Sequence, residues 1–208
     1  MRTLRNWNEG RLAFPGSDST EDALPPTSAH NNFELVNILE MIATLNRMQA
    51  DGVVGKCALG GAVGAYFYVE VTYTEDIDVF VLLNPKPGRL LVSLEDLHSY
   101  LERHGWTVDR DGYSVIAGCK VQFLPAEGPL LREALEQSVE REDLGAPVHV
   151  FSAEHLMAIA LKLGRAKDRT RLLQFLETKR FDERKLSEIL TRHGLLDAWM
   201  RFRKLMTG

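Results

Sequence analysis

The sequence predicts an α+β protein, in which a small mixed β-sheet is flanked by helices and followed by a helical C-terminal part. Runs of strand-forming residues, such as 76–83 and 120–124, alternate with helical segments in the first part of the chain. From Ser152 to the end, the apolar residues recur with a helical period. The 208 residues, 45% of them hydrophobic and 26% charged, are typical of one globular domain with a helical appendage.

This pattern divides the chain into three parts. Residues 1–30 show neither a helical nor a strand period and contain several prolines, so we expect an extended arm. Residues 31–151 form the α/β core. Residues 152–208 form helices packed on that core, because they carry too few apolar residues to stand alone.

The elements of the first half follow from apolar periodicity and from turn residues. We expect, in chain order, a helix from about Asn32 (N-cap Asn31 or Asn32) to Asp51-Gly52, a strand at 56–59, a helix at 62–69, a strand at 76–83, a loop at 84–88 and a helix from Ser93 to Gly105.

The second half is assigned in the same way. We expect a hairpin of 106–108 with 113–116 around an Asp-Gly turn, a strand at 120–124, a helix at 129–141 and a strand at 148–151. A helix that starts at Ser152 should follow, and then three further helices at 168–177, 182–193 and 196–205.

Asp76 and Asp78 are the first candidate functional residues. Side chains two residues apart on a strand share one face, and the apolar neighbours of these carboxylates indicate a buried strand. Buried carboxylates are costly unless a cation neutralises them, so the pair predicts a divalent metal site. The alternative is a strand end at which both carboxylates reach solvent.

Gly60-Gly61 lies upstream of this pair, at the start of an expected helix. Glycines let the backbone approach a ligand closely, and a helix start offers free N–H groups to phosphate. An ordinary strand-to-helix turn would have the same sequence. Together with the carboxylates, the glycine turn predicts a nucleoside triphosphate site.

These motifs resemble the nucleotidyltransferase superfamily, in which a Gly-Gly or Gly-Ser turn precedes an Asp-x-Asp strand. The segment Thr74-Glu-Asp76-Ile-Asp78 is similar to the branch of AbiEii toxin-like proteins. The resemblance implies an enzyme that uses Mg²⁺ or Mn²⁺ to transfer a nucleoside monophosphate from an NTP to a hydroxyl of RNA, protein or a small molecule. It also implies a nucleotide-site role for Thr74, and a toxin whose partner is an antitoxin.

A basic cluster follows the last expected strand. Lys162, Arg165 and Arg169 would share one face of an unbroken helix and could reach a triphosphate. The segments 152–156 and 162–168 resemble the toxin-like branch, which implies a catalytic Lys162 and places Asp168 at the site. The alternative is a solvated charged face.

Gln122 departs from the family pattern, because it stands where a third acidic residue is expected. A glutamine can bind a metal or a substrate through its amide, but it cannot act as a base. Asp109, Asp111 and Glu127 are possible substitutes, although each is more simply a turn or helix-start residue. The second hypothesis is therefore a non-catalytic nucleotide-binding or partner-binding relative.

Composition limits the remaining possibilities. The net charge of −4 argues against coating of long nucleic acid. Cys57 and Cys119 lack metal-ligand spacing and are expected to be reduced core residues. No apolar run approaches the roughly 20 residues of a membrane span, so we expect a cytoplasmic protein without membrane contact.

Overall fold

A computed structural model describes residues 28–70, 74, 76–83 and 94–207 of the chain. Within them the chain forms one seven-stranded sheet and eight helices. The mixed α and β composition predicted from the sequence is confirmed. The arm up to residue 27, the 84–88 loop and the Ser93 cap lie outside the described residues.

The sheet has the strand order β3-β4-β5-β2-β1-β7-β6. It is mixed, because β2 pairs in parallel with β5 and β1 pairs in parallel with β7, whereas the remaining pairs are antiparallel. The strands are β1 (Cys57–Leu59), β2 (Ile77–Val81), β3 (Thr107–Val108), β4 (Ser114–Ile116), β5 (Cys119–Pro125), β6 (Val139–Arg141) and β7 (Val148–Val150).

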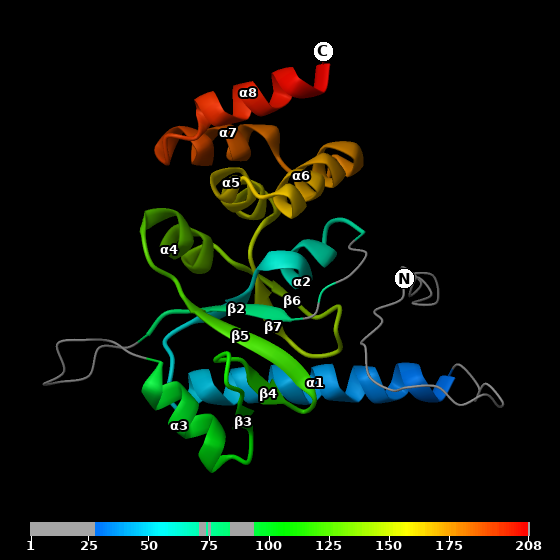
Figure 1. Cartoon of the computed structure of the whole chain (residues 1–208), viewed down its shortest axis with the longest axis vertical. Helices are drawn as coiled ribbons and strands as arrows, with labels where there is room; N and C mark the ends of the chain where they lie inside the picture. The colour runs from blue at the N-terminus through cyan, green and yellow to red at the C-terminus, as the bar shows by residue number, and fades with distance from the viewer. Residues whose placement is uncertain (1–27, 71–73, 75, 84–93, 208) are drawn as a thin grey trace, which may run out of the picture.

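The helices lie on both sides of the sheet. In Figure 1, α1 and α3 lie on one side, α2 and α4 lie on the other, and α5 to α8 are stacked beyond them. The helices are α1 (Ser28–Ala50), α2 (Gly61–Tyr66), α3 (Glu95–Arg103), α4 (Pro129–Glu136), α5 (Ala153–Leu163), α6 (Ala166–Thr178), α7 (Glu183–Arg192) and α8 (Leu196–Thr207). No described helix is long and apolar enough to cross a membrane.

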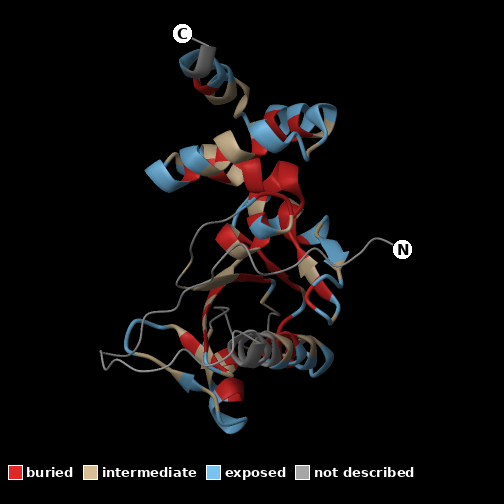
Figure 2. Cartoon of the chain, turned by 90° about the vertical axis from the view of Figure 1, so that its right-hand side faces the viewer, coloured by how far each residue is buried: buried red, intermediate tan, exposed pale blue. Residues whose placement is uncertain are grey.

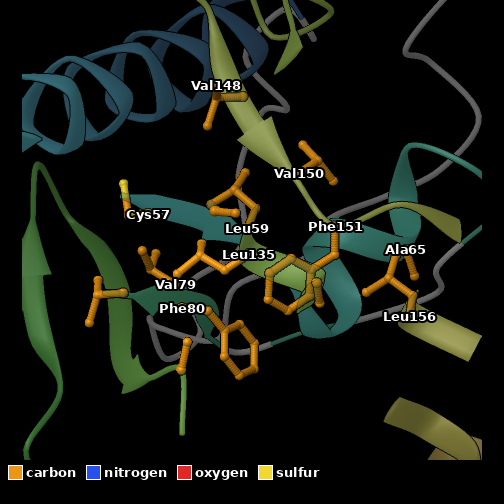
Figure 3. Packing of buried hydrophobic residues seen from close by; sticks show 14 of the residues in the cluster. Cys57, Leu59, Ala65, Val79, Phe80, Leu135, Val148, Val150, Phe151 and Leu156 are labelled. Carbon is orange, nitrogen blue, oxygen red and sulfur yellow. The ribbon is translucent and has the colours of Figure 1, made fainter. Parts of the chain in front are cut away.

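Buried hydrophobic residues lie on both faces of the central strands of the sheet. Figure 2 shows buried residues running from the sheet into α5, α6 and α7. Successive residues Val79 and Phe80 of β2 are both buried, although they point to opposite faces. In Figure 3 the ring of Phe80 lies beside Phe151, with a centroid separation of 4.8 Å. Cys57 and Cys119 are free and buried, and burial raises their thiol pKa values to about 12 and about 11.

Two elements differ from the sequence prediction. The first helix begins at Ser28, soon after Pro25-Pro26 in the sequence, so Asn31 and Asn32 lie inside it and the predicted N-cap is wrong. The helix α4 ends at Glu136, because residues 139–141 pair with β7 as an antiparallel edge strand. The expected cap at Ser152 is confirmed, since its side chain accepts the N–H of His155. Asp182 caps α7 in the same way, by accepting the N–H of Lys185.

Glu133 joins α4 to α5 and α7. Its carboxylate accepts hydrogen bonds from Nη2 and Nε of Arg192 at 2.7 and 3.2 Å, and lies 2.8 Å from Nε2 of His193. The bonds from Arg192 are the main reason that its pKa is lowered to about 2, although burial opposes the shift. This carboxylate therefore stays ionised over the whole physiological range.

The fully buried His155 extends this network into the core. Its Nε2 lies 3.4 Å from Glu133 Oε1, and its Nδ1 lies 2.9 Å from Ser152 Oγ. Burial lowers the pKa of His155, so the ring is neutral and carries one proton. Since a carboxylate only accepts, we assign the proton to Nε2 and the Ser152 hydroxyl as donor to Nδ1.

We predict that Glu133→Gln lowers the free energy of unfolding by about 2 kcal/mol at pH 7, because it leaves Arg192 and His193 without their anion. Urea unfolding of both proteins measures the loss. The exposed Glu136→Gln, on the same helix, is the matched control.

The loss of unfolding free energy in Glu133→Gln must also depend on pH. Because the folded pKa of Glu133 is depressed, its stabilisation is present above its ordinary pKa of 4.5 and disappears as the pH falls toward about 2. A constant difference between the two proteins from pH 7 to pH 3 would contradict the role assigned to this carboxylate.

Candidate active site

The glycine turn lies directly against Asp78. The N–H of Gly60 donates to the backbone oxygen of Asp78 at 2.9 Å. Gly61 has a φ of +53°, and a Cβ added there would collide with the Asp78 carboxylate. A Cβ at Gly60 would collide with the Phe80 ring. Both glycines are therefore needed for the turn to pack on β2, and the carboxylate lies at the start of α2.

Asp76 and Asp78 are close enough to interact. The pKa of Asp78 is raised, first by burial and then by the negative charge of Asp76. Thr74 donates its hydroxyl to the backbone oxygen of Asp76 at 2.8 Å and lies 3.5 Å from its carboxylate. The structure thus gives Thr74 a contact that orients Asp76, while its predicted contact with a nucleotide stays a prediction.

Three cations from the start of α6 act on the same carboxylate. Lys167, Arg171 and Arg165 each lower the pKa of Asp78, in that order of size, against the larger effect of burial. These residues lie about 90 positions after Asp78 in the sequence. The fold therefore brings a cluster of positive side chains to the carboxylates of β2.

Asp168 binds two of these cations, Arg165 and Arg171. It is fully buried, and its Oδ2 accepts from Nε of Arg165 at 2.7 Å and from the backbone N–H of Arg165 at 3.2 Å. Nη1 of Arg171 lies 3.9 Å from its Oδ1. Asp168 thus caps α6 and holds two arginines that also act on Asp78, which is a positioning contact.

Gln122 is the direct neighbour of Asp78 in the sheet. The parallel ladder of β2 and β5 pairs Asp78 with Gln122, so both side chains leave the same face. The amide of Gln122 makes no hydrogen bond to any residue that the structure describes. Its oxygen is therefore available to a ligand of the two carboxylates.

The proposed substitutes for a third acid have other roles. Oδ1 of Asp109 accepts the N–H groups of Asp111 and Tyr113 at 2.9 Å and closes the hairpin turn. Asp111 and Glu127 are exposed. The turn and helix-start interpretation fits all three residues.

Two residues that the sequence analysis did not identify, Tyr113 and Lys120, lie at the edge of the site that holds Asp76. Asp76 raises the pKa of Tyr113 through its charge and through a hydrogen bond, and Nζ of Lys120 lies 4.0 Å above the Tyr113 ring. Alternation along β5 could have placed Lys120 on the face of Gln122. Only the tertiary fold reveals Tyr113.

Lys162 is placed differently from the expectation. Gly164 is in the left-handed conformation and ends α5, so Lys162 and Arg165 lie on separate helices. The glycine terminates the helix between them, as the separate helices expected from Ser152 and over 168–177 require, so the shared face of an unbroken helix does not form. Lys162 lines a cavity beside Glu133 and Arg192, and its catalytic role stays a prediction.

The described residues fit a divalent cation. Asp76, Asp78 and Gln122 offer hard oxygen ligands, and burial leaves the charge on Asp78 only partly compensated. In the described parts of the chain, no group of three or more histidine, cysteine or acidic residues is arranged so that it could hold a metal ion. This is the expected result of an amide at position 122. The carboxylates with Lys167 and Arg165 beside them can hold a metal and a polyphosphate together.

The comparisons with known proteins found similarity in the fold. The sequence matches no protein-family model, and a comparison with curated proteins gives no match. An antigenic nucleotidyltransferase-like protein from Paracoccidioides brasiliensis is similar with a TM-score of 0.49 and 10% identity, over 78% of this chain and 90% of that one.

The antibiotic-resistance factor ANT(2'')-Ia is similar with a TM-score of 0.46 and 14% identity, over 85% of this chain and 98% of that one. Such distant likenesses concern the path of the chain. They do not assign a role to any residue of this site.

We predict that Gly61→Ala lowers the free energy of unfolding by about 2 kcal/mol or more, because the methyl group adds a collision with Asp78 to the backbone strain. Gly105→Ala is the matched control, since Gly105 has a φ of +84° and nothing within 4 Å of an added Cβ. Urea unfolding compares them. Equal losses of unfolding free energy in the two variants would show that Asp78 of β2 does not collide with a side chain at Gly61.

We also predict that Asp78→Asn stabilises the metal-free protein at pH 7, by about 0.5–2 kcal/mol. The raised pKa means that the folded state favours the protonated acid, so stability is lost as the pH rises through the folded pKa. Thermal unfolding in EDTA measures this, with the exposed Asp111→Asn as control. Destabilisation by Asp78→Asn would show that the cations of α6 outweigh burial.

Proposed function

We propose that this chain is a nucleotidyltransferase, which transfers a nucleoside monophosphate from a metal-bound NTP to a hydroxyl acceptor. The observation that carries the proposal is the meeting of Asp76 and Asp78 with the glycine turn on one side and Lys167, Arg165 and Arg171 on another. Carboxylates next to a cationic cluster suit a bound cation together with a polyphosphate.

In this proposal the residues bind and orient the substrates. Asp76 and Asp78 hold Mg²⁺ or Mn²⁺, with the amide oxygen of Gln122 as a further ligand. When bound, the metal supplies polarisation of the α-phosphate and neutralises charge. Arg165 and Lys167 bind the triphosphate, while Asp168 fixes the fork of Arg165. The acceptor oxygen forms a bond to the α-phosphorus and releases its proton to solvent, as the bond from the α-phosphorus to the pyrophosphate leaving group breaks.

A second candidate function is a non-catalytic nucleotide-binding relative. It is favoured by the register that places Gln122 beside Asp78, because a neutral amide cannot take the proton of the attacking hydroxyl. The toxin role and the antitoxin partner implied by the resemblance stay predictions, as do the base and the acceptor.

Label transfer tests the first proposal. The protein is incubated with each α-labelled NTP, Mg²⁺ or Mn²⁺, total RNA and cell extract. We expect label on RNA, protein or a small molecule, and its loss in Asp76→Asn and Asp78→Asn, because both variants remove a metal ligand. Asp111→Asn should retain transfer, since its carboxylate is exposed on a turn.

The outcomes separate the two candidates. NTP binding without transfer, together with activity gained on Gln122→Asp, would establish the non-catalytic relative. Transfer that survives in Asp78→Asn would contradict the assigned site. Absence of both binding and transfer would refute both functions.

A further inference from the structure

A cavity of about 530 Å³ lies between α4, α5 and α7, and is lined by Pro129, Leu130, Glu133, Lys162, Arg192 and His193. We propose that it binds the oxyanion group of a small molecule, a phosphate or a carboxylate, through Lys162 and Arg192. The inference stands independently of the proposed transferase activity, because it concerns binding by different side chains.

The charges around the cavity leave a surplus of positive charge. The one carboxylate, Glu133, is already used by Arg192, His193 and His155. Lys162 is exposed and forms no ion pair or hydrogen bond with a residue that the structure describes. An anion entering the cavity therefore meets the unpaired ammonium group of Lys162. Glu188 does not line the cavity, but its charge also acts on Arg192; its carboxylate lies 3.8 Å from Nε of Arg184.

Arg192 retains donors that can face such an anion. It uses Nε and Nη2 for Glu133, at 3.2 and 2.7 Å, which leaves Nη1 without a partner among the described residues. The bond to Glu133 also holds the guanidinium in place before a ligand arrives, so little conformational freedom is lost on binding. The fork of Arg192 and the point charge of Lys162 together suit an oxyanion.

The remaining wall selects the rest of the ligand. Pro129 and Leu130 begin α4, and Leu130 is 3% exposed, so this side of the cavity is apolar and fixed. Cavities of roughly 300–1,000 Å³ hold small-molecule ligands. We therefore expect a compact ligand with an anionic head and an apolar body, which benzoate and phenyl phosphate represent.

This cavity and the carboxylates of β2 use different cations. Arg165, Lys167 and Arg171 act on Asp78, whereas Lys162 lines the cavity beside Glu133 and Arg192. The left-handed Gly164 separates the two sets along the chain. A variant of one set can thus serve as the control for the other.

Binding of phenyl phosphate, benzoate and inorganic phosphate by the full chain, in EDTA, tests the proposal by calorimetry. Benzamide is the neutral comparison. We expect phenyl phosphate or benzoate to bind more tightly than benzamide, and Lys162→Gln to weaken that binding at least about tenfold, because a charged hydrogen bond is lost. Lys167→Gln should change it less than about twofold. The preferred head group identifies the ligand as a phosphate or a carboxylate.

Two results would overturn the proposal. One is binding of all probes no tighter than that of benzamide. The other is a loss in Lys167→Gln without one in Lys162→Gln, which would place the anion at the cations of α6. Lys162 is exposed and unpaired, so its replacement should not impair folding, and thermal unfolding checks this. Failure of label transfer leaves this result unaffected.

Discussion

The close approach of β2 to the glycine turn is the constraint on which the site depends. Asp78 leaves no room for a side chain at Gly61, and Phe80 leaves none at Gly60. The strand can carry a carboxylate into this position only because the facing backbone has no Cβ. The same contact fixes where α2 starts and which face of β2 the acidic pair occupies, so backbone packing and the chemistry of the site have one cause.

The charge of Asp78 is only partly compensated by its surroundings. Burial and the charge of Asp76 oppose ionisation of Asp78, and the cations of α6 compensate only in part. Those cations have their own anion in the buried Asp168, which keeps two arginines in position. A buried carboxylate of this kind costs some stability in the free protein, which the cation and polyphosphate of the proposed function would restore on binding.

Local sequence patterns predicted much of this geometry. The glycine turn, the Asp-Gly hairpin and the Ser152 cap follow from chemistry within a few residues, and the described structure has each of them. The strand predicted over 76–83 is shorter in the structure, since β2 begins at Ile77 and Asp76 directly precedes it. The strand that carries Gln122 was also predicted, and the parallel pairing of β2 with β5 places Gln122 beside Asp78.

The failures of sequence reasoning have physical reasons as well. The shared basic face from Lys162 to Arg169 was conditional on a continuous helix, and the condition is not met because Gly164 adopts a left-handed conformation and ends α5. Residues 139–141 have no strong local preference and became a strand because β7 offered an edge. Tyr113 beside Asp76, and Glu133 beside His193, are contacts between distant segments that no local pattern encodes.

The pairing of β1 with β7 has a consequence for how the chain folds. Leu59, which directly precedes the glycine turn, pairs with Val150, and its backbone oxygen accepts the N–H of Phe151 at 3.0 Å. Such a long-range contact closes late and slows folding, because the loop entropy is lost before the contact forms. During synthesis, β1 is an open sheet edge until Phe151 has left the ribosome, and a nascent chain stalled before that point would expose it to aggregation.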